Sequence, residues 1–190
     1  MSLLWLTPLC LIPVSSEAGT QQPPSAEFKR LLKQAIESDS EFEDKFDAKV
    51  WLLDMSKRLN KRAKHIPLKE RMTLLKAVHK EAVRAKLDPQ LVLSVIDIES
   101  GFDRFAVSRA GARGLMQIMP FWITEIGHNE DNLFDIETNL KYGCAILSIY
   151  IKKEKKQLSL ALARYNGSLG RMKYPKKVLT SLRKHWLTGK

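Results

Sequence analysis

The sequence predicts an all-α protein, and three observations carry this prediction. Apolar residues recur at intervals of three and four through most of the chain, which is the spacing of amphipathic helices. No series of short segments alternates polar and apolar residues, so a β-sheet is not expected. Four of the nine glycines fall between Gly101 and Gly127, with helix signals on both sides. Residues 103–119 are therefore expected to form a folded-back loop or short hairpin within a helical domain.

Composition limits the class of protein. The chain has 190 residues, of which 44% are hydrophobic and 28% charged, so a packed core is expected and wholesale disorder is not. No apolar run reaches the roughly 18 residues that a membrane-spanning helix needs. The two cysteines, Cys10 and Cys144, form neither a disulfide framework nor a metal-ligand pattern. The cysteines therefore predict no metal site.

The N-terminal part of the chain divides at changes in composition. Residues 3–14 are apolar and precede Ser16-Glu17-Ala18, which offers small residues where a signal peptidase cleaves. A polar Gln-Pro-rich stretch follows, and then apolar residues at helical spacing as far as the boundary at Pro67. These changes predict a signal peptide over residues 1–18 and a linker over 19–25. An N-terminal helical extension is expected over 26–65, and the domain that carries the chemistry over 66–190.

Individual helices have recognisable ends. Ser40 is expected to cap a helix that runs to Leu59 within the extension. Another follows Pro67. The pair Asp88-Pro89 supplies an N-cap and a proline for the first position of the next helix, which is apolar on most sides and ends at Gly101. Further helices are expected at about 138–152, 157–166 and 174–186.

Glu99 stands where the apolar pattern calls for a hydrophobic residue. It shares one helical stripe with apolar residues, namely Leu91, Val92, Val95 and Ile96. A buried carboxylate usually keeps its proton near neutral pH, as a general acid must. Two structural alternatives remain open: Glu99 caps the turn at Ser100-Gly101, or it pairs with an arginine.

Other carboxylates near Glu99 do not form a convincing pair with it. Asp97 is two residues away, about 200° around the helix, on the polar side with Gln90 and Ser94, where we expect it to be solvated. Asp103 lies in the following loop and stays open as a partner. The sequence thus favours a mechanism with one carboxylate over the usual pair of a glycoside hydrolase.

Four sequence motifs carry a family resemblance. They are Glu99-Ser100-Gly101-Phe102, Ala106-Val107-Ser108, the run GARGLMQIMP at 111–120, and ARYNG at 163–167. In order and spacing, this set resembles the soluble lytic transglycosylases with a goose-lysozyme-type fold, over roughly residues 70–175. The resemblance implies a lysozyme-like helical domain. The sequence departs from the common family pattern at Phe121-Trp122. Trp122 is therefore expected either to stack on sugar or to pack against the next helix.

The resemblance also implies roles for individual residues. Glu99 becomes the catalytic acid and then the base, and substrate contacts are expected at Ser108, Gln117, Met116, Met119, Tyr165 and Asn166. The hydroxyl of Tyr165 is expected to orient the Glu99 carboxyl. Amide side chains suit a sugar N-acetyl group, and apolar surfaces suit pyranose faces. Met116, Met119 and Tyr165 can equally be core residues.

The implied reaction is non-hydrolytic cleavage of the MurNAc–GlcNAc β-1,4 bond of peptidoglycan, which leaves 1,6-anhydroMurNAc ends. This reaction implies no metal and no organic cofactor. One alternative is a goose-type lysozyme that hydrolyses the same bond with Asp103 holding water. Another is a non-catalytic basic protein that binds cell wall or nucleic acid. We expect an exported enzyme, periplasmic, secreted or associated with the outer membrane, that acts as a monomer and requires no nucleic acid.

The C-terminal segment is strongly basic. Residues 151–190 hold twelve Lys or Arg residues and one acid, Glu154, in a chain of net charge +11. Such a segment attracts anionic polymers weakly, or is simply a solvated face.

Overall fold

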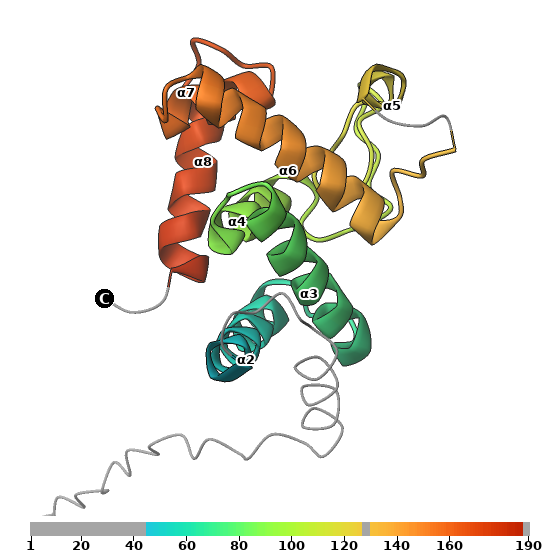
Figure 1. The fold of residues 1–190 in the computed structure, drawn as a ribbon, viewed down its shortest axis with the longest axis vertical. Helices are drawn as coiled ribbons and strands as arrows, with labels where there is room; N and C mark the ends of the chain where they lie inside the picture. Colours follow the sequence, from blue (N-terminus) through green and yellow to red (C-terminus); the bar gives the residue numbers. More distant parts are fainter. Residues whose placement is uncertain (1–44, 127–129, 188–190) are drawn as a thin grey trace, which may run out of the picture.

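The computed structural model describes residues 45–126 and 130–187. Within these ranges it contains seven α-helices and one π-helix, and no strand beyond isolated bridges. The elements, drawn in Figure 1, are α2 (Lys45–Arg62), α3 (Leu68–Arg84), α4 (Pro89–Glu99), α5 (Phe121–Ile126), α6 (Ile136–Lys153), α7 (Leu158–Tyr165), α8 (Lys173–Ser181) and η1 (Leu182–Trp186). The prediction of an all-α protein is confirmed, and the three late helices fall where they were expected.

Helix α4 is the central helix, packed against α3, α8 and η1. Its six residues from Leu91 to Ile96 are all buried. The start is the one predicted: the Asp88 carboxylate accepts a hydrogen bond of 2.7 Å from the Gln90 N–H, and Pro89 occupies the first turn. The helix ends at Glu99, and Gly101 turns the chain with φ +59°, a conformation that glycine adopts readily.

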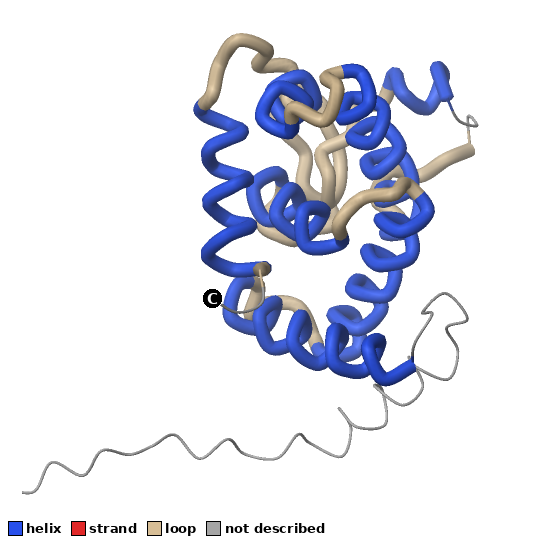
Figure 2. The backbone as a smooth tube through the Cα atoms, turned by 60° about the vertical axis from the view of Figure 1, so that its left-hand side comes forward, coloured by secondary structure: helices blue, strands red, loops and turns tan. Residues whose placement is uncertain are grey.

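The segment after α4 forms the predicted folded-back loop, which lies among the helices in Figure 2. Arg113 and Ile118 exchange two backbone hydrogen bonds of 2.9 Å, and the Ser108 N–H donates to the Ala112 carbonyl at 2.9 Å. Val107 also forms a bridge with Arg113. These bonds fold the loop into a compact hairpin-like unit with no helical segment.

Asn139 of α6 anchors this loop from below, a role that the sequence did not reveal. It is 1% exposed. Its Oδ1 accepts from the Met116 N–H at 2.8 Å, and its Nδ2 donates to the carbonyls of Arg113 at 2.9 Å and Leu133 at 2.7 Å. One side chain therefore satisfies three buried backbone groups that have no helix partner.

Gly114 allows the loop to approach Asn139 this closely. A Cβ at this position would lie 2.4 Å from both the Leu133 carbonyl oxygen and Asn139 Nδ2, and the backbone has φ +73°. Neither the space nor the conformation suits a larger residue. The second glycine of the GARG motif, Gly114, is thus required by packing.

Helix α2 of the predicted extension shares the core of the domain. Its residues Leu52, Met55 and Leu59 are fully buried in the same cluster as the apolar face of α4. The proposed boundary at residue 66 thus separates two stretches of sequence that pack together. The predicted signal peptide, the linker and the cap at Ser40 lie outside the described residues. In 45–126 and 130–187, no helix is both long and apolar enough to cross a membrane.

Candidate active site

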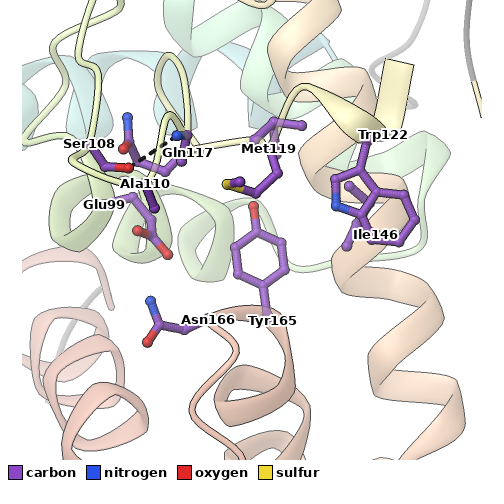
Figure 3. A pocket seen from close by; sticks show the side chains of 11 residues that line it. Glu99, Ser108, Ala110, Gln117, Met119, Trp122, Ile146, Tyr165 and Asn166 are labelled. Carbon is purple, nitrogen blue, oxygen red and sulfur yellow. Dashed lines mark hydrogen bonds between the residues drawn. The ribbon is translucent and has the colours of Figure 1, made fainter. Parts of the chain in front are cut away.

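A pocket of about 250 Å³ opens beside the end of α4. Its walls come from the end of α4, the loop after it, α5, α6 and the end of α7. Figure 3 shows the Glu99 carboxyl and the Asn166 amide turned toward each other, with the ring of Tyr165 beside them. The lining residues are Glu99, Ser108, Ala110, Ala112, Gln117, Ile118, Met119, Trp122, Ile146, Tyr165 and Asn166.

Glu99 is the carboxylate of this pocket. Burial raises the pKa of its carboxyl, because the charged form loses hydration. Hydrogen bonds from Tyr174 and then from the Asn166 amide oppose this shift without cancelling it. A carboxyl group in this setting holds its proton at higher pH than a solvated glutamate does. It can therefore give a proton to a neighbouring oxygen and take one back.

Tyr174 is the tyrosine that contacts the Glu99 carboxyl. Its hydroxyl donates to Glu99 Oε1 at 2.6 Å, from the first turn of α8. Burial and the nearby Glu99 raise the pKa of Tyr174 well above its ordinary value, so the hydroxyl remains a donor. The sequence pattern does not single out this residue. Its spacing from Val178 is that of an ordinary core position, and only its partner distinguishes it.

The expected role of the Tyr165 hydroxyl is wrong. That hydroxyl donates to the Met116 carbonyl at 2.8 Å, so it is not directed at the carboxyl of Glu99. The side chain does line the pocket, as Figure 3 shows. Tyr165 thus ties the end of α7 to the loop after α4 and leaves its ring as a wall of the pocket.

Met116 was expected to line the groove and does not. Its side chain is fully buried and packs against Gly143 of α6, where an added Cβ would lie 2.3 Å from the methionine sulfur. Met119 does line the pocket, together with Trp122. The two methionines point differently because Met116 lies within the tight turn of the loop, whose backbone Asn139 holds against α6.

The remaining predicted substrate contacts reach the pocket. Ser108 Oγ accepts from the Ala112 N–H at 3.0 Å. Gln117 Nε2 donates to the carbonyls of Ala106 at 3.1 Å and Gly114 at 2.9 Å. These bonds fix the amide plane and leave Oε1 as its acceptor. Asn166 is exposed at the end of α7.

Asp97 is not solvated, contrary to expectation. Its side chain is 3% exposed and pairs with Arg62 of α2 at 2.7 Å. The polar side of α4 is covered by α8 and η1, which the sequence pattern of α4 alone does not reveal. Asp103 is exposed, does not line the pocket, and accepts from the Phe105 N–H at 2.8 Å. Among the described residues that line the pocket, Glu99 is the single carboxylate.

Comparison with known proteins identifies a family and several similar proteins. Residues 76–185 match the family described as the transglycosylase SLT domain. Similar curated proteins include membrane-bound lytic murein transglycosylase F of Desulfosudis oleivorans, 35% identical over 102 residues, and membrane-bound lytic murein transglycosylase C of Photorhabdus laumondii, 31% identical over 129 residues. These alignments cover 50% and 59% of this chain, and 22% and 34% of the relatives. The chain thus spans about a third or less of their length.

A solved structure is also similar. It is the X-ray structure of an inactive mutant of the lytic transglycosylase Slt from Pseudomonas aeruginosa, with a TM-score of 0.48 and 19% identity. The alignment covers 77% of this chain and 31% of that one. The family match covers more than half of this chain, from the middle of α3 to η1. The chain therefore belongs to the transglycosylase SLT domain family.

Proposed function

We propose that this protein is a peptidoglycan lytic transglycosylase. It cleaves the MurNAc–GlcNAc β-1,4 bond without water and leaves 1,6-anhydroMurNAc ends. The observation that carries the proposal is one partly buried carboxyl, Glu99, with a raised pKa at the wall of a pocket. Membership of the transglycosylase SLT domain family and the names of the similar proteins support it.

Glu99 acts twice in the proposed reaction. Its carboxyl first gives a proton to the oxygen that bridges the two sugars, while the bond from that oxygen to C1 of MurNAc breaks and C1 gains oxocarbenium character. The resulting carboxylate then takes the proton of the C6 hydroxyl of the same MurNAc. The C6 oxygen bonds to C1 and closes the anhydro ring. No proton is gained or lost by the enzyme over the cycle.

The pocket offers suitable contacts for such a substrate. The Gln117 Oε1 can accept from the N–H of an N-acetyl group, and the exposed Asn166 amide can answer its carbonyl. Apolar and aromatic walls from Met119, Trp122 and Tyr165 suit the faces of pyranose rings. In this proposal Trp122 takes the sugar-stacking role.

The competing hydrolase is less well supported. A goose-type lysozyme would need a second carboxylate to hold water, and Asp103 was the candidate for it. Asp103 is exposed and outside the lining of the pocket. A one-carboxylate site favours capture of C1 by the substrate's own C6 hydroxyl.

Product analysis tests the proposal. Purified sacculi are treated with the protein, and the released muropeptides are reduced with borohydride and weighed by mass spectrometry. We expect anhydro ends, which carry no reducing group and are not altered by borohydride. After reduction they are about 20 Da lighter than hydrolysed ends, by one water and the two hydrogens that borohydride adds to a hydrolysed end. Reducible ends would assign the lysozyme reaction. Binding to sacculi or DNA without any product would support the binding-protein alternative.

We also propose that the enzyme acts outside the cytoplasm. Its proposed substrate lies there, and residues 1–18 share with export signals an apolar stretch followed by small residues. The similar proteins are named as membrane-bound enzymes. The expected monomeric state stays a prediction.

The basic C-terminal segment divides into two groups of lysines. Lys152, Lys155 and Lys156 line a second pocket with Lys86, at the far ends of α3 and α6. Lys173, Lys176 and Lys177 are instead exposed on α8, the helix that carries Tyr174. We propose that this second group attracts the carboxylates of peptidoglycan stem peptides. Exposed charges act over about 8 Å at physiological ionic strength, so only nearby lysines matter.

Replacing Lys173, Lys176 and Lys177 by glutamine is expected to raise KM on sacculi about threefold at low salt and to leave kcat unchanged, because exposed charges guide association. Added salt should reduce the difference. Steady-state kinetics at two salt concentrations measures both effects.

The matched control replaces Lys152, Lys155 and Lys156, which removes equal charge at the second pocket. Its KM should stay near that of the wild type. An equal rise of KM in both triple variants would show that net charge, and not its position on α8, determines affinity.

A further inference from the structure

A second buried carboxylate lies two residues before Glu99 on α4, and the proposed reaction does not use it. Asp97 Oδ1 accepts from Arg62 Nη2 at 2.7 Å and from Arg62 Nε at 3.2 Å. Its Oδ2 accepts from Ser181 Oγ at 2.5 Å, and Ser181 Oγ accepts from Trp186 Nε1 at 3.1 Å. Both carboxylate oxygens are thus occupied, by groups from α2 and α8.

The same two helices meet at both carboxylates. Helix α4 carries Asp97 and Glu99, and α8 carries Ser181 and Tyr174, the residue that donates to Glu99. In Figure 1, α8 runs beside α4 along the side of the domain. A helix is stiff over two turns, so a bond at Ser181 fixes the axial position of Tyr174 as well. The Asp97–Ser181 bond is therefore a second hydrogen bond between α4 and α8, the helix that brings Tyr174 to Glu99.

Helix α2 also contributes to this contact between α4 and α8, although it lies outside the segment that matches the family, 76–185. Arg62 supplies the charge that Asp97 needs in order to be buried as a carboxylate. Arg58, one turn earlier, donates to the carbonyls of His185 at 3.1 Å and Leu187 at 3.2 Å, and so holds the end of η1. Helix α2 is thus bonded to α4 through Arg62 and to the end of η1 through Arg58.

A buried ion pair is by itself weak evidence of stabilisation, because apolar residues of similar volume often serve as well. What a hydrogen-bonded pair adds is a fixed position, since its bonds form only in one register of the helices. Catalytic groups need such fixing, because a displacement of about 1 Å can cost a hundredfold in rate.

We propose that Arg62, Asp97 and Ser181 are positioning residues of the active site, which hold α8 in the register where the Tyr174 hydroxyl reaches Glu99. The proposal rests on the proposed function, in which Glu99 is the acid and base. It makes the helical extension, through Arg62, a working part of the catalytic unit.

The charged and titratable groups around the two carboxylates define the test. Arg62 from α2 pairs with Asp97. On η1, burial and then Arg62 lower the pKa of His185, and Asp97 and Lys184 are the other charged groups near it. Around Glu99 stand the two tyrosines, Tyr174 and Tyr165, whose pKa values are raised well above the ordinary range, and the neutral Asn166. Near neutral pH, the charges that the variants change are those of Arg62 and Asp97.

The test measures the pKa of Glu99 in the full chain by carbon-detected NMR of its side-chain carboxyl. Three variants are compared with the wild type: Arg62→Gln, Asp97→Asn and Ser181→Ala. Tyr174→Phe gives the full effect of losing the tyrosine bond. Because that bond favours the carboxylate, its loss raises the pKa of Glu99. We expect all three variants to raise it in the same direction, and kcat to fall about tenfold with KM within about twofold.

A direct effect of charge predicts a different pattern. Removing the positive Arg62 would raise the pKa of Glu99, removing the negative Asp97 would lower it, and Ser181→Ala would leave it unchanged. Opposite signs for Arg62→Gln and Asp97→Asn would therefore overturn the proposal. Ser181→Ala changes no charge and little volume, so it tests the proposal even if the charged variants unfold.

Arg84→Gln is the matched control for Arg62→Gln. Arg84 pairs with Glu81 at 2.6 Å, with side chains 47% and 8% exposed, against 39% and 3% for Arg62 and Asp97. Its pair lies within α3, away from α8. We expect Arg62→Gln and Arg84→Gln to lose similar thermal stability. The pKa of Glu99 and kcat should change in Arg62→Gln and stay at their wild-type values in Arg84→Gln. If both variants changed the Glu99 pKa and kcat equally, Arg62, Asp97 and Ser181 would have only a structural role. The titration remains informative even if the wild type forms no anhydro product, which would refute the proposed function alone.

Discussion

Glu99→Gln is expected to lower the release of anhydro-muropeptides by about a thousandfold or more. Glutamine keeps the shape of the side chain and can still accept from Tyr174, but it neither gives nor takes a proton. Positioned acid and base groups each contribute about 10² to 10⁴ in rate, and here one residue supplies both transfers. Initial rates on sacculi, followed by mass analysis of the products, measure the loss.

The same substitution should not destabilise the fold. Burial raises the pKa of Glu99 in the folded protein, so between the unfolded and folded pKa values the unfolded chain binds fewer protons. Stability therefore falls as pH rises through this interval, and the wild type keeps the full penalty above it. Glu99→Gln removes the penalty. We expect its Tm at pH 7 to equal or exceed that of the wild type, and this advantage to vanish below about pH 4.

Asp103→Asn is the control for Glu99→Gln. The Asp103 side chain is exposed, outside the pocket, and its contact with the Phe105 N–H is one that asparagine can also make. Its activity should remain near that of the wild type. A loss as large as that of Glu99→Gln would restore the two-carboxylate hydrolase. Substantial turnover by Glu99→Gln itself would mean that another group is the acid.

Asn139→Ala is expected to lower the free energy of unfolding by about 3 kcal/mol. It leaves the Met116 N–H and the Leu133 carbonyl without their buried partner, while the Arg113 carbonyl loses one of its two donors and keeps the Ile118 N–H. Each unsatisfied group costs about 1 to 3 kcal/mol before relaxation. Water entering the space recovers part of this cost. Urea denaturation monitored by circular dichroism measures the change.

Activity should fall as well in Asn139→Ala, because the loop it anchors supplies Gln117 and Met119 to the pocket. The matched control is Asn60→Ala, which removes a bond to Arg71 of 2.8 Å in an exposed setting. That change should cost less than about 0.5 kcal/mol and leave turnover intact. Equal losses for the two asparagines would contradict the anchoring role.

The sequence by itself determined the features that depend on neighbouring residues. Asp88 and Pro89 begin α4 because a side-chain acceptor and a fixed φ favour that position locally, and Gly101 ends it for an equally local reason. The apolar stripe of α4 also identified Glu99, since a carboxyl on a buried face stands out against its neighbours along the helix. The motifs of the loop further located most of the pocket walls.

Only the tertiary structure decided which side chains meet. Periodicity states which face of a helix is buried, but it does not state which side chain from another helix covers that face. Tyr174 reaches Glu99 across 75 residues of sequence, while the nearer candidate, Tyr165, is directed to the Met116 carbonyl. Asp97 was assigned to solvent because the polar side of α4 looks exposed until α8 and Arg62 cover it. Such pairings depend on how whole helices pack, because a hydrogen bond needs its partners within about 3 Å, a distance that no local pattern encodes.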